Sequence, residues 1–300
     1  MYTFAEAVES IVGSRPAGRG KNVMVRCPVH EDRDPSLSVN LDNGLWICFG
    51  CGAKGNIIGL AERFGVTLDD DAIALSRARS LDLPEPSVDF ADRGKELAAS
   101  LFLHRPQVIV DYINGRSLSP LTVRHFSMGY DHGKNAVAMP YWDGDVVTGI
   151  KYRTGDGKKF SEPGSHYGIY NVDNVRQKPI VVLCEGESDT HAAWSALTSM
   201  GISGTIVREV GVGGLSGASI SPERWEVLSV DLLWAKKVIV IFDNDEAGHR
   251  GASIAVQAIG QRATTLTPTR GTDLSDHLMS GGTLKEIGLL DELAKYPVAE

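Results

Sequence analysis

Acidic residues follow two apolar runs that lie far apart in the sequence. Glu185 comes directly after the run 181–184, and Asp243 and Asp245 come at the end of the run 238–242. Short runs of apolar, β-branched residues are typical of buried parallel strands, and ligands bind at the carboxyl edge of such sheets. Each run continues into helix-like sequence, which predicts two strand–loop–helix units. We therefore expect the three acids to meet at one edge of a parallel sheet.

Neither acidic turn contains a lysine or arginine that could neutralise a buried carboxylate. Clusters of oxygen ligands suit Mg²⁺ or Mn²⁺, which prefer carboxylates, water and phosphate oxygens. In the alternative interpretation, Asp243 and Asp245 cap a helix and Glu185 is a solvated loop acid. Two acidic strand ends in one chain favour the metal site.

Three cysteines and one histidine have the spacing of a zinc site. Cys27 and His30 form one pair, and Cys48 and Cys51 form a second pair after a seventeen-residue interval. Each pair turns two ligands toward one point, and a set of four protein ligands predicts one structural Zn²⁺ ion. The fourth cysteine, Cys184, falls within a predicted buried strand. We therefore expect no disulfides, and we expect the protein to occupy a reducing compartment.

The segment from Cys27-Pro28-Val29-His30 to Cys51-Gly52-Ala53-Lys54-Gly55-Asn56 resembles the zinc-binding domain of bacterial and phage primases. The resemblance implies a zinc ribbon whose sheet reads a short template sequence. Arg33, Asn40 and Trp46 are candidates for these contacts, because polar groups read base edges and aromatic rings stack on unpaired bases. A structural or solvated role for each of them remains an alternative.

The acidic turns at Glu185-Gly186-Glu187-Ser188-Asp189 and Asp243-Asn244-Asp245 resemble the Toprim fold, which primases, topoisomerases and some nucleases share. The resemblance implies that Glu185, Asp243 and Asp245 hold two or more Mg²⁺ or Mn²⁺ ions for phosphoryl transfer. It also implies a catalytic role for Asp189.

A third acidic turn, 271–278, is similar to a primase element whose acids lie near the metals. The resemblance implies that Asp276 is a further ligand of magnesium or manganese. Thr272 stands where those primases have lysine, which makes the roles of Asp273 and Asp276 less certain than those of the other acids.

Cations are concentrated on the strand-like sequence that precedes the Toprim region. Lys151, Arg153 and Lys159 suit binding of a triphosphate or a nucleic-acid backbone, whereas a solvated charged face is the alternative. The segment 112–130, which contains Arg116-Ser117-Leu118-Ser119, resembles the sequence that opens the polymerase core of primases. The sequence alone favours the solvated face. Primases carry basic residues in this segment near the nucleotide, so the resemblance makes the binding role of Lys151 and Lys159 an equal alternative.

Net charge and hydropathy argue against several other classes of protein. The formal net charge of −8 argues against a protein that coats nucleic acid through a general basic field. The sequence contains no run of eighteen apolar residues, and no basic region precedes an apolar core at its start, so we expect neither a membrane span nor a signal peptide. A cytoplasmic location in a bacterial cell is expected, with a phage or mobile element as a further origin.

The predicted fold class is an α+β zinc ribbon, followed by an α+β basic subdomain and an α/β, Rossmann-like Toprim core. We predict four segments: a zinc ribbon for template recognition at 1–66, a linker at 67–94, a helical and basic subdomain at 95–177 and a Toprim metal-binding domain at 178–300. The linker prediction depends on its acidic residues together with Pro84 and Pro86.

This domain order is that of a DNA primase, a nucleotidyltransferase that makes short RNA primers on a single-stranded DNA template. The resemblance implies ribonucleoside triphosphates as substrates and a replicative helicase that acts in trans. A Toprim nuclease would use the same acids, and a non-catalytic DNA-binding adaptor of replication would need none of them. A topoisomerase would require a nucleophilic tyrosine in a strand-breaking domain, for which 300 residues leave no room.

Overall fold

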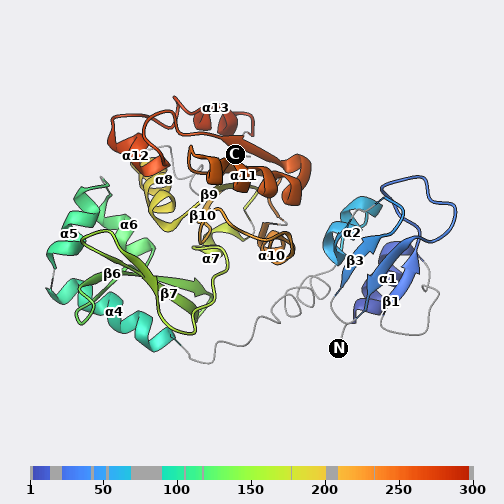
Figure 1. Ribbon diagram of the computed structural model, residues 1–300, viewed down its shortest axis with the longest axis horizontal. Helices are drawn as coiled ribbons and strands as arrows, with labels where there is room; N and C mark the ends of the chain where they lie inside the picture. The colour runs from blue at the N-terminus through green and yellow to red at the C-terminus, as the bar shows by residue number, and fades with distance from the viewer. Residues whose placement is uncertain are drawn as a thin grey trace. The chain divides into compact units, whose positions relative to one another are not determined.

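A computed structural model describes residues 3–13, 22–41, 44–51, 54–68, 90–104, 106–116, 118–176, 178–200, 209–232 and 234–296. The chain divides into two compact units, Met1–Glu85 and Pro86–Glu300 (Figure 1). Most of the predicted linker lies outside the described residues, so the division into four segments stays a prediction. No helix among the described residues has both the length and the apolar character needed to cross a membrane.

The described residues of the first unit form a four-stranded antiparallel sheet with two helices. The strands pair in the order β1-β2-β3-β4, and Leu37 on β2 lies opposite Cys48 on β3. A capping box formed by Thr3 and Glu6 begins the first helix, which buries Phe4 and three other apolar residues. The elements are α1 (Phe4–Val12), β1 (Asn22–Val25), β2 (Leu37–Asn40), β3 (Leu45–Cys48), β4 (Lys54–Asn56) and α2 (Ile57–Phe64).

The second unit begins with helices that pack on an antiparallel sheet of order β5-β6-β7-β8 (Figure 1). The elements are α4 (Ala91–His104), α5 (Gln107–Asn114), α6 (Pro120–His125), β5 (Gly129–Asp131), β6 (Ala136–Asp143), β7 (Val146–Thr154) and β8 (Lys159–Ser161). Lys151 and Arg153 lie at alternate positions of β7, so both side chains project from the same face of this sheet.

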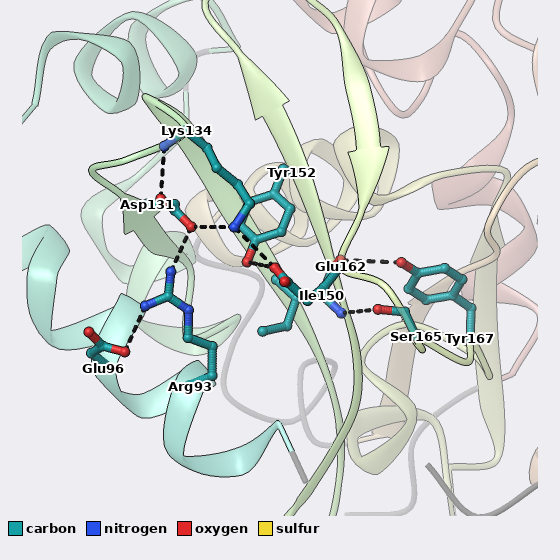
Figure 2. Close-up of polar contacts among 9 residues, drawn as sticks. All are labelled: Arg93, Glu96, Asp131, Lys134, Ile150, Tyr152, Glu162, Ser165 and Tyr167. Atoms are coloured by element: carbon teal, nitrogen blue, oxygen red, sulfur yellow. Dashed lines mark hydrogen bonds and ion pairs between the residues drawn. The ribbon is translucent and has the colours of Figure 1, made fainter. Parts of the chain in front are cut away.

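Buried polar groups tie α4 to this sheet (Figure 2). Asp131 at the end of β5 is 3% exposed, and the cations of Arg93 and Lys134 lie 2.7 and 2.9 Å from its carboxylate. Lys134 also lies 3.2 Å from Glu162, which accepts a hydrogen bond from Tyr152. These ion pairs satisfy a carboxylate that would otherwise be buried without a partner.

The rest of the second unit is a parallel sheet of order β10-β9-β11-β12. Alternate residues of β9 belong to two different cores: Val182 and Cys184 to one, Val181 and Leu183 to the other. Both faces of the sheet are therefore covered, as parallel sheets require. The strands are β9 (Ile180–Cys184), β10 (Val210–Gly214), β11 (Lys237–Ile241) and β12 (Ala263–Leu266). The helices are α7 (Val172–Val175), α8 (Glu187–Ser199), α10 (Pro222–Leu228), α11 (Glu246–Ile259), α12 (Leu274–Met279) and α13 (Leu289–Ala294), with 3₁₀ turns at Ser229–Leu232 and Gly260–Arg262.

The predicted fold class is confirmed, because a zinc ribbon precedes an α/β core built on a parallel sheet. The order β9-β11 explains how distant acids meet. These strands are direct neighbours, with Cys184 opposite Ile241, and the residues that follow them emerge at the same edge.

Gly248 sets how closely α11 approaches this edge. A Cβ atom at position 248 would collide with the backbone carbonyl oxygen of Asp243, whereas the corresponding space at Gly168 is open. We predict that Gly248→Ala lowers the free energy of unfolding by about 1–3 kcal/mol, because α11 has to move away from the strand end. Chemical denaturation would measure the loss, with Gly168→Ala as the control. Equal stability of the two variants would contradict the prediction.

Candidate metal centres and nucleotide site

The predicted zinc ligands lie together in the first unit. One ligand atom from each of Cys27, His30, Cys48 and Cys51 lies within 4.8 Å of all the others. Burial alone would raise the pKa of Cys48, but the contact with Ser36 and hydrogen bonds from the backbone N–H groups of Cys51 and Gly50 lower it to about 6. A thiolate is the form that binds Zn²⁺, and two or more sulfur ligands with one imidazole suit that ion. These residues therefore fit a structural zinc ion.

Asp32 organises the loop between the two pairs of ligands. Its Oδ2 atom accepts hydrogen bonds from the backbone N–H of Cys27 at 2.8 Å and from the hydroxyl of Ser36 at 2.9 Å. Its Oδ1 atom lies 3.8 Å from His30 Nε2, while His30 Nδ1 lies 3.8 Å from Cys48 Sγ. The carboxylate thus faces the far side of the ligand histidine at a distance beyond hydrogen bonding, and its charge favours this orientation of the ring. Sequence analysis missed this residue, although an acid two positions after a ligand histidine was the available signal.

The three candidate template contacts differ in exposure. Arg33 is exposed on the loop of the first ligand pair. Trp46 is only 3% exposed, and the guanidinium of Arg63 lies 5.2 Å from its ring centroid. A base can stack only on an exposed ring face, so the burial of Trp46 favours the structural alternative. Asn40, the third candidate, is half-buried at the end of β2.

Glu185 and Asp243 meet at the carboxyl edge of the parallel sheet. The backbone N–H of Asp243 donates a hydrogen bond of 3.1 Å to Glu185 Oε2. Burial, followed by the charges of Glu185, Asp273 and Asp245, raises the pKa of Asp243 to about 7. Burial also raises the pKa of Glu185. Carboxyl groups that resist ionisation at neutral pH because other acids surround them form a site for cations.

Asp245 begins helix α11 and caps it. One of its oxygens, Oδ1, accepts a hydrogen bond of 2.7 Å from the backbone N–H of Gly248. The helix-cap interpretation of this residue is therefore correct. It does not exclude metal binding, because a carboxylate has a second oxygen.

Asp189 and Asp273 extend the acidic cluster. Asp189, on the first turn of α8, is 6% exposed and accepts a hydrogen bond of 3.0 Å from the backbone N–H of Ser275. Burial and the charge of Asp273 raise the pKa of Asp189 to about 8. Asp273 is the N-cap of α12, whereas Asp276 is exposed on the first turn of that helix. The charge of Asp273 thus acts on both Asp189 and Asp243, and the ligand role of Asp276 stays a prediction.

The three predicted cations line one cavity of ≈ 210 Å³. The charge of Lys159 lowers the pKa of both Glu185 and Asp243, so this lysine lies close to the acidic cluster. Burial, and then the charge of Arg116, lowers the pKa of Arg153. The predicted cations therefore line one cavity, and the charge of Lys159 acts on two of the predicted acids. Cations and acids in this relation suit an anionic ligand that binds with divalent metal ions.

Lys151 differs from the other two cations because it has its own counter-ion. Its ammonium lies 2.6 Å from Glu187 Oε1, and Glu187 also accepts a hydrogen bond from Tyr141. The rings of Tyr141 and Tyr167 lie 5.8 and 5.1 Å from the same ammonium. Sequence analysis did not identify Glu187 as the partner of Lys151, because the two lie on different elements.

The fold and the sites define a class of protein: a zinc ribbon joined to an α/β core with an acidic edge. Residues 4–85 match the family model described as a CHC2 zinc finger. The chain is 31% identical to a DNA primase of Halalkalibacterium halodurans over 88% of this chain and 53% of that protein. It is 29% identical to a DNA primase of Deinococcus radiodurans over 43% of this chain and 22% of that protein.

The second unit also has structural neighbours among primases. A DNA primase domain from Pseudomonas aeruginosa superposes with a TM-score of 0.51 and 20% identity, over 69% of this chain and 79% of that domain. A DnaG catalytic core superposes with a TM-score of 0.50 and 17% identity, over 68% of this chain and 78% of that core. These likenesses show the fold. By sequence, the chain is similar to bacterial DNA primases, and it spans about half the length of the relative that it matches over most of its sequence.

We predict that Asp32→Asn weakens zinc binding by about 10–100-fold, because an amide removes the charge that faces His30 and is a weaker acceptor for the hydrogen bonds of the loop. Competition with a chromophoric chelator would measure the affinity. Asp34→Asn, an exposed acid of the same loop, is the control. Equal zinc affinity of the two variants would show that Asp32 does not support the ligands.

The raised pKa of Asp189 predicts how the free energy of unfolding depends on pH. Its carboxyl holds a proton up to about pH 8 in the folded protein, compared with an ordinary value of 3.8. The folded protein thus binds more protons than the unfolded chain between these values, so the free energy of unfolding falls as the pH rises through this window. Asp189→Asn should flatten that fall in magnesium-free buffer, and Asp276→Asn should not. Parallel denaturation curves at pH 5 and pH 8 would test this, and an unchanged slope in Asp189→Asn would contradict it.

Proposed function

We propose that this protein is a DNA primase that synthesises short RNA primers from ribonucleoside triphosphates on a single-stranded DNA template. The observation that carries the proposal is the hydrogen bond from the backbone N–H of Asp243 to Glu185, since it joins acids of two separate strand ends into one cluster. Sequence similarity to a DNA primase over 88% of the chain supports the same conclusion.

Glu185, Asp243 and Asp245 would hold two or more Mg²⁺ or Mn²⁺ ions. Bound metal ions would stabilise the charge that develops on the attacking 3′-hydroxyl and on the pyrophosphate leaving group. Repulsion among the acids supports this role, because burial and neighbouring carboxylates raise the pKa of Glu185 and Asp243. Asp273 would complete the cluster, with Asp189 held by Ser275 as an orienting group and Asp276 at its periphery.

The cavity beside the acids would receive the triphosphate. Lys159 and Arg153 offer charge to phosphate oxygens, and Lys151 is held at the same cavity by Glu187. The zinc ribbon would read the template, with Arg33 as an exposed contact. The replicative helicase in trans, the location inside a bacterial cell and the four-segment domain division belong to the same proposal.

Incubating the full chain with single-stranded DNA, labelled ribonucleotides and Mg²⁺ or Mn²⁺ tests the proposal. We expect short labelled RNA products. Shortened DNA would identify a nuclease, and the absence of both products would leave a DNA-binding adaptor; either result would reject the primase.

We predict that Asp243→Asn reduces primer synthesis by at least about 100-fold, because the metal ions contribute several kcal/mol to the reaction. The same variant should be at least as stable as the wild type, since it removes one charge from a crowded cluster. Asp291→Asn, an exposed acid at the start of α13, is the matched control. Normal synthesis by Asp243→Asn would exclude this carboxylate from metal binding.

A further inference from the structure

Two tyrosine hydroxyls hold the buried imidazole of His191 between them. The hydroxyl of Tyr112 lies 2.9 Å from Nδ1, and the hydroxyl of Tyr170 lies 2.9 Å from Nε2. His191 is fully buried, and burial lowers its pKa to about 3, so the ring is neutral. A neutral imidazole has one N–H group and one acceptor nitrogen. One tyrosine therefore donates to the ring, and the other accepts from it.

Tyr170 decides which tyrosine donates. Its side chain is 1% exposed, and among the residues that the structure describes, His191 is the only hydrogen-bond partner of its hydroxyl. If the imidazole donated to Tyr170, the Tyr170 proton would be buried without an acceptor, which is unfavourable. Tyr170 therefore donates to Nε2. His191 carries its proton on Nδ1 and donates it to Tyr112.

This series of hydrogen bonds continues from Tyr112 to Ser188. The Oγ atom of Ser188 lies 3.4 Å from the hydroxyl of Tyr112 and 3.4 Å from Arg153 Nη1. Tyr112 accepts from His191, so its own proton is available to Ser188, and a guanidinium can only donate. Two donors thus occupy the two lone pairs of Ser188 Oγ. The serine O–H then points to a third partner.

Ser188 lines a cavity together with Lys151, Arg153 and Lys159. We infer that Ser188 is a ligand-binding residue whose O–H is held as a donor toward a phosphoryl oxygen in this cavity. An oxygen acceptor matches the serine proton, and Arg153, which forms no ion pair within the described part of the chain, makes an anionic acceptor the favoured one. The identification of that group as a nucleotide triphosphate rests on the proposed function.

The tautomer of His191 is the first test. Nitrogen-15 NMR of the full chain distinguishes the two neutral tautomers, and the signals of His191 can be assigned by their loss in His191→Gln. We expect a protonated Nδ1 and an unprotonated Nε2. A proton on Nε2 would reverse the chain of donors and overturn the inference.

Binding of tripolyphosphate is the second test, and it requires neither template nor synthesis. We expect Ser188→Ala to weaken binding by about tenfold, as for the loss of a hydrogen bond to a charged group. Ser199→Ala, at the exposed end of the same helix, should bind within about twofold of the wild type.

Tyr170→Phe provides a remote readout, because Tyr170 contacts His191 and not Ser188. It should weaken binding by a smaller factor and allow the Nε2–H tautomer. Wild-type affinity in Ser188→Ala would overturn the inference. Failure of the wild type to make primers, with the Ser188 effect intact, would reject the proposed reaction alone.

Discussion

Repulsion among carboxylates packed at the end of a parallel sheet is the constraint on which the rest of the second unit depends. Strands β9 and β11 pair directly, so Glu185 and Asp243 emerge side by side and share a hydrogen bond. Burial raises the pKa of both groups, and the adjoining Asp189 has a pKa of about 8. A protein keeps such an arrangement at the expense of its own stability, and divalent cations are the ligands that relieve it. The surrounding structure is organised to hold these acids rather than to neutralise them.

The three cations of the site differ in whether an acid neutralises them. Lys151 is neutralised by Glu187 and enclosed by two tyrosine rings, whereas Lys159 is exposed and acts on the acids through its charge. Arg153 is half-buried and contacts a serine hydroxyl. One cavity therefore contains a lysine with a fixed position and two cations that have charge to offer a ligand. A charge count from the sequence would have treated the three as equivalent.

In the zinc unit, residues that are not predicted zinc ligands position and activate those that are. Asp32 binds the N–H of Cys27 and faces the imidazole of His30, so one carboxylate orders the loop and orients a ligand. Hydrogen bonds to Cys48 favour its thiolate, which prepares the site for metal before any ion is bound. In both units, neighbouring groups set the charge and orientation of the side chains that would bind a metal ion or an anion.

The sequence by itself determined the zinc ligands, the fold class and the pairing of the two acidic strand ends. These features depend on short-range spacing and on apolar runs, which are local properties of the chain. Only the tertiary structure decided that the charge of Asp273 acts on Asp189 and Asp243, because this effect depends on how α12 packs against α8. The same holds for the burial of Trp46, the pairing of Lys151 with Glu187 and the chain from Tyr170 to Ser188. Each of these depends on contacts between elements far apart in sequence, whose partners no local pattern specifies.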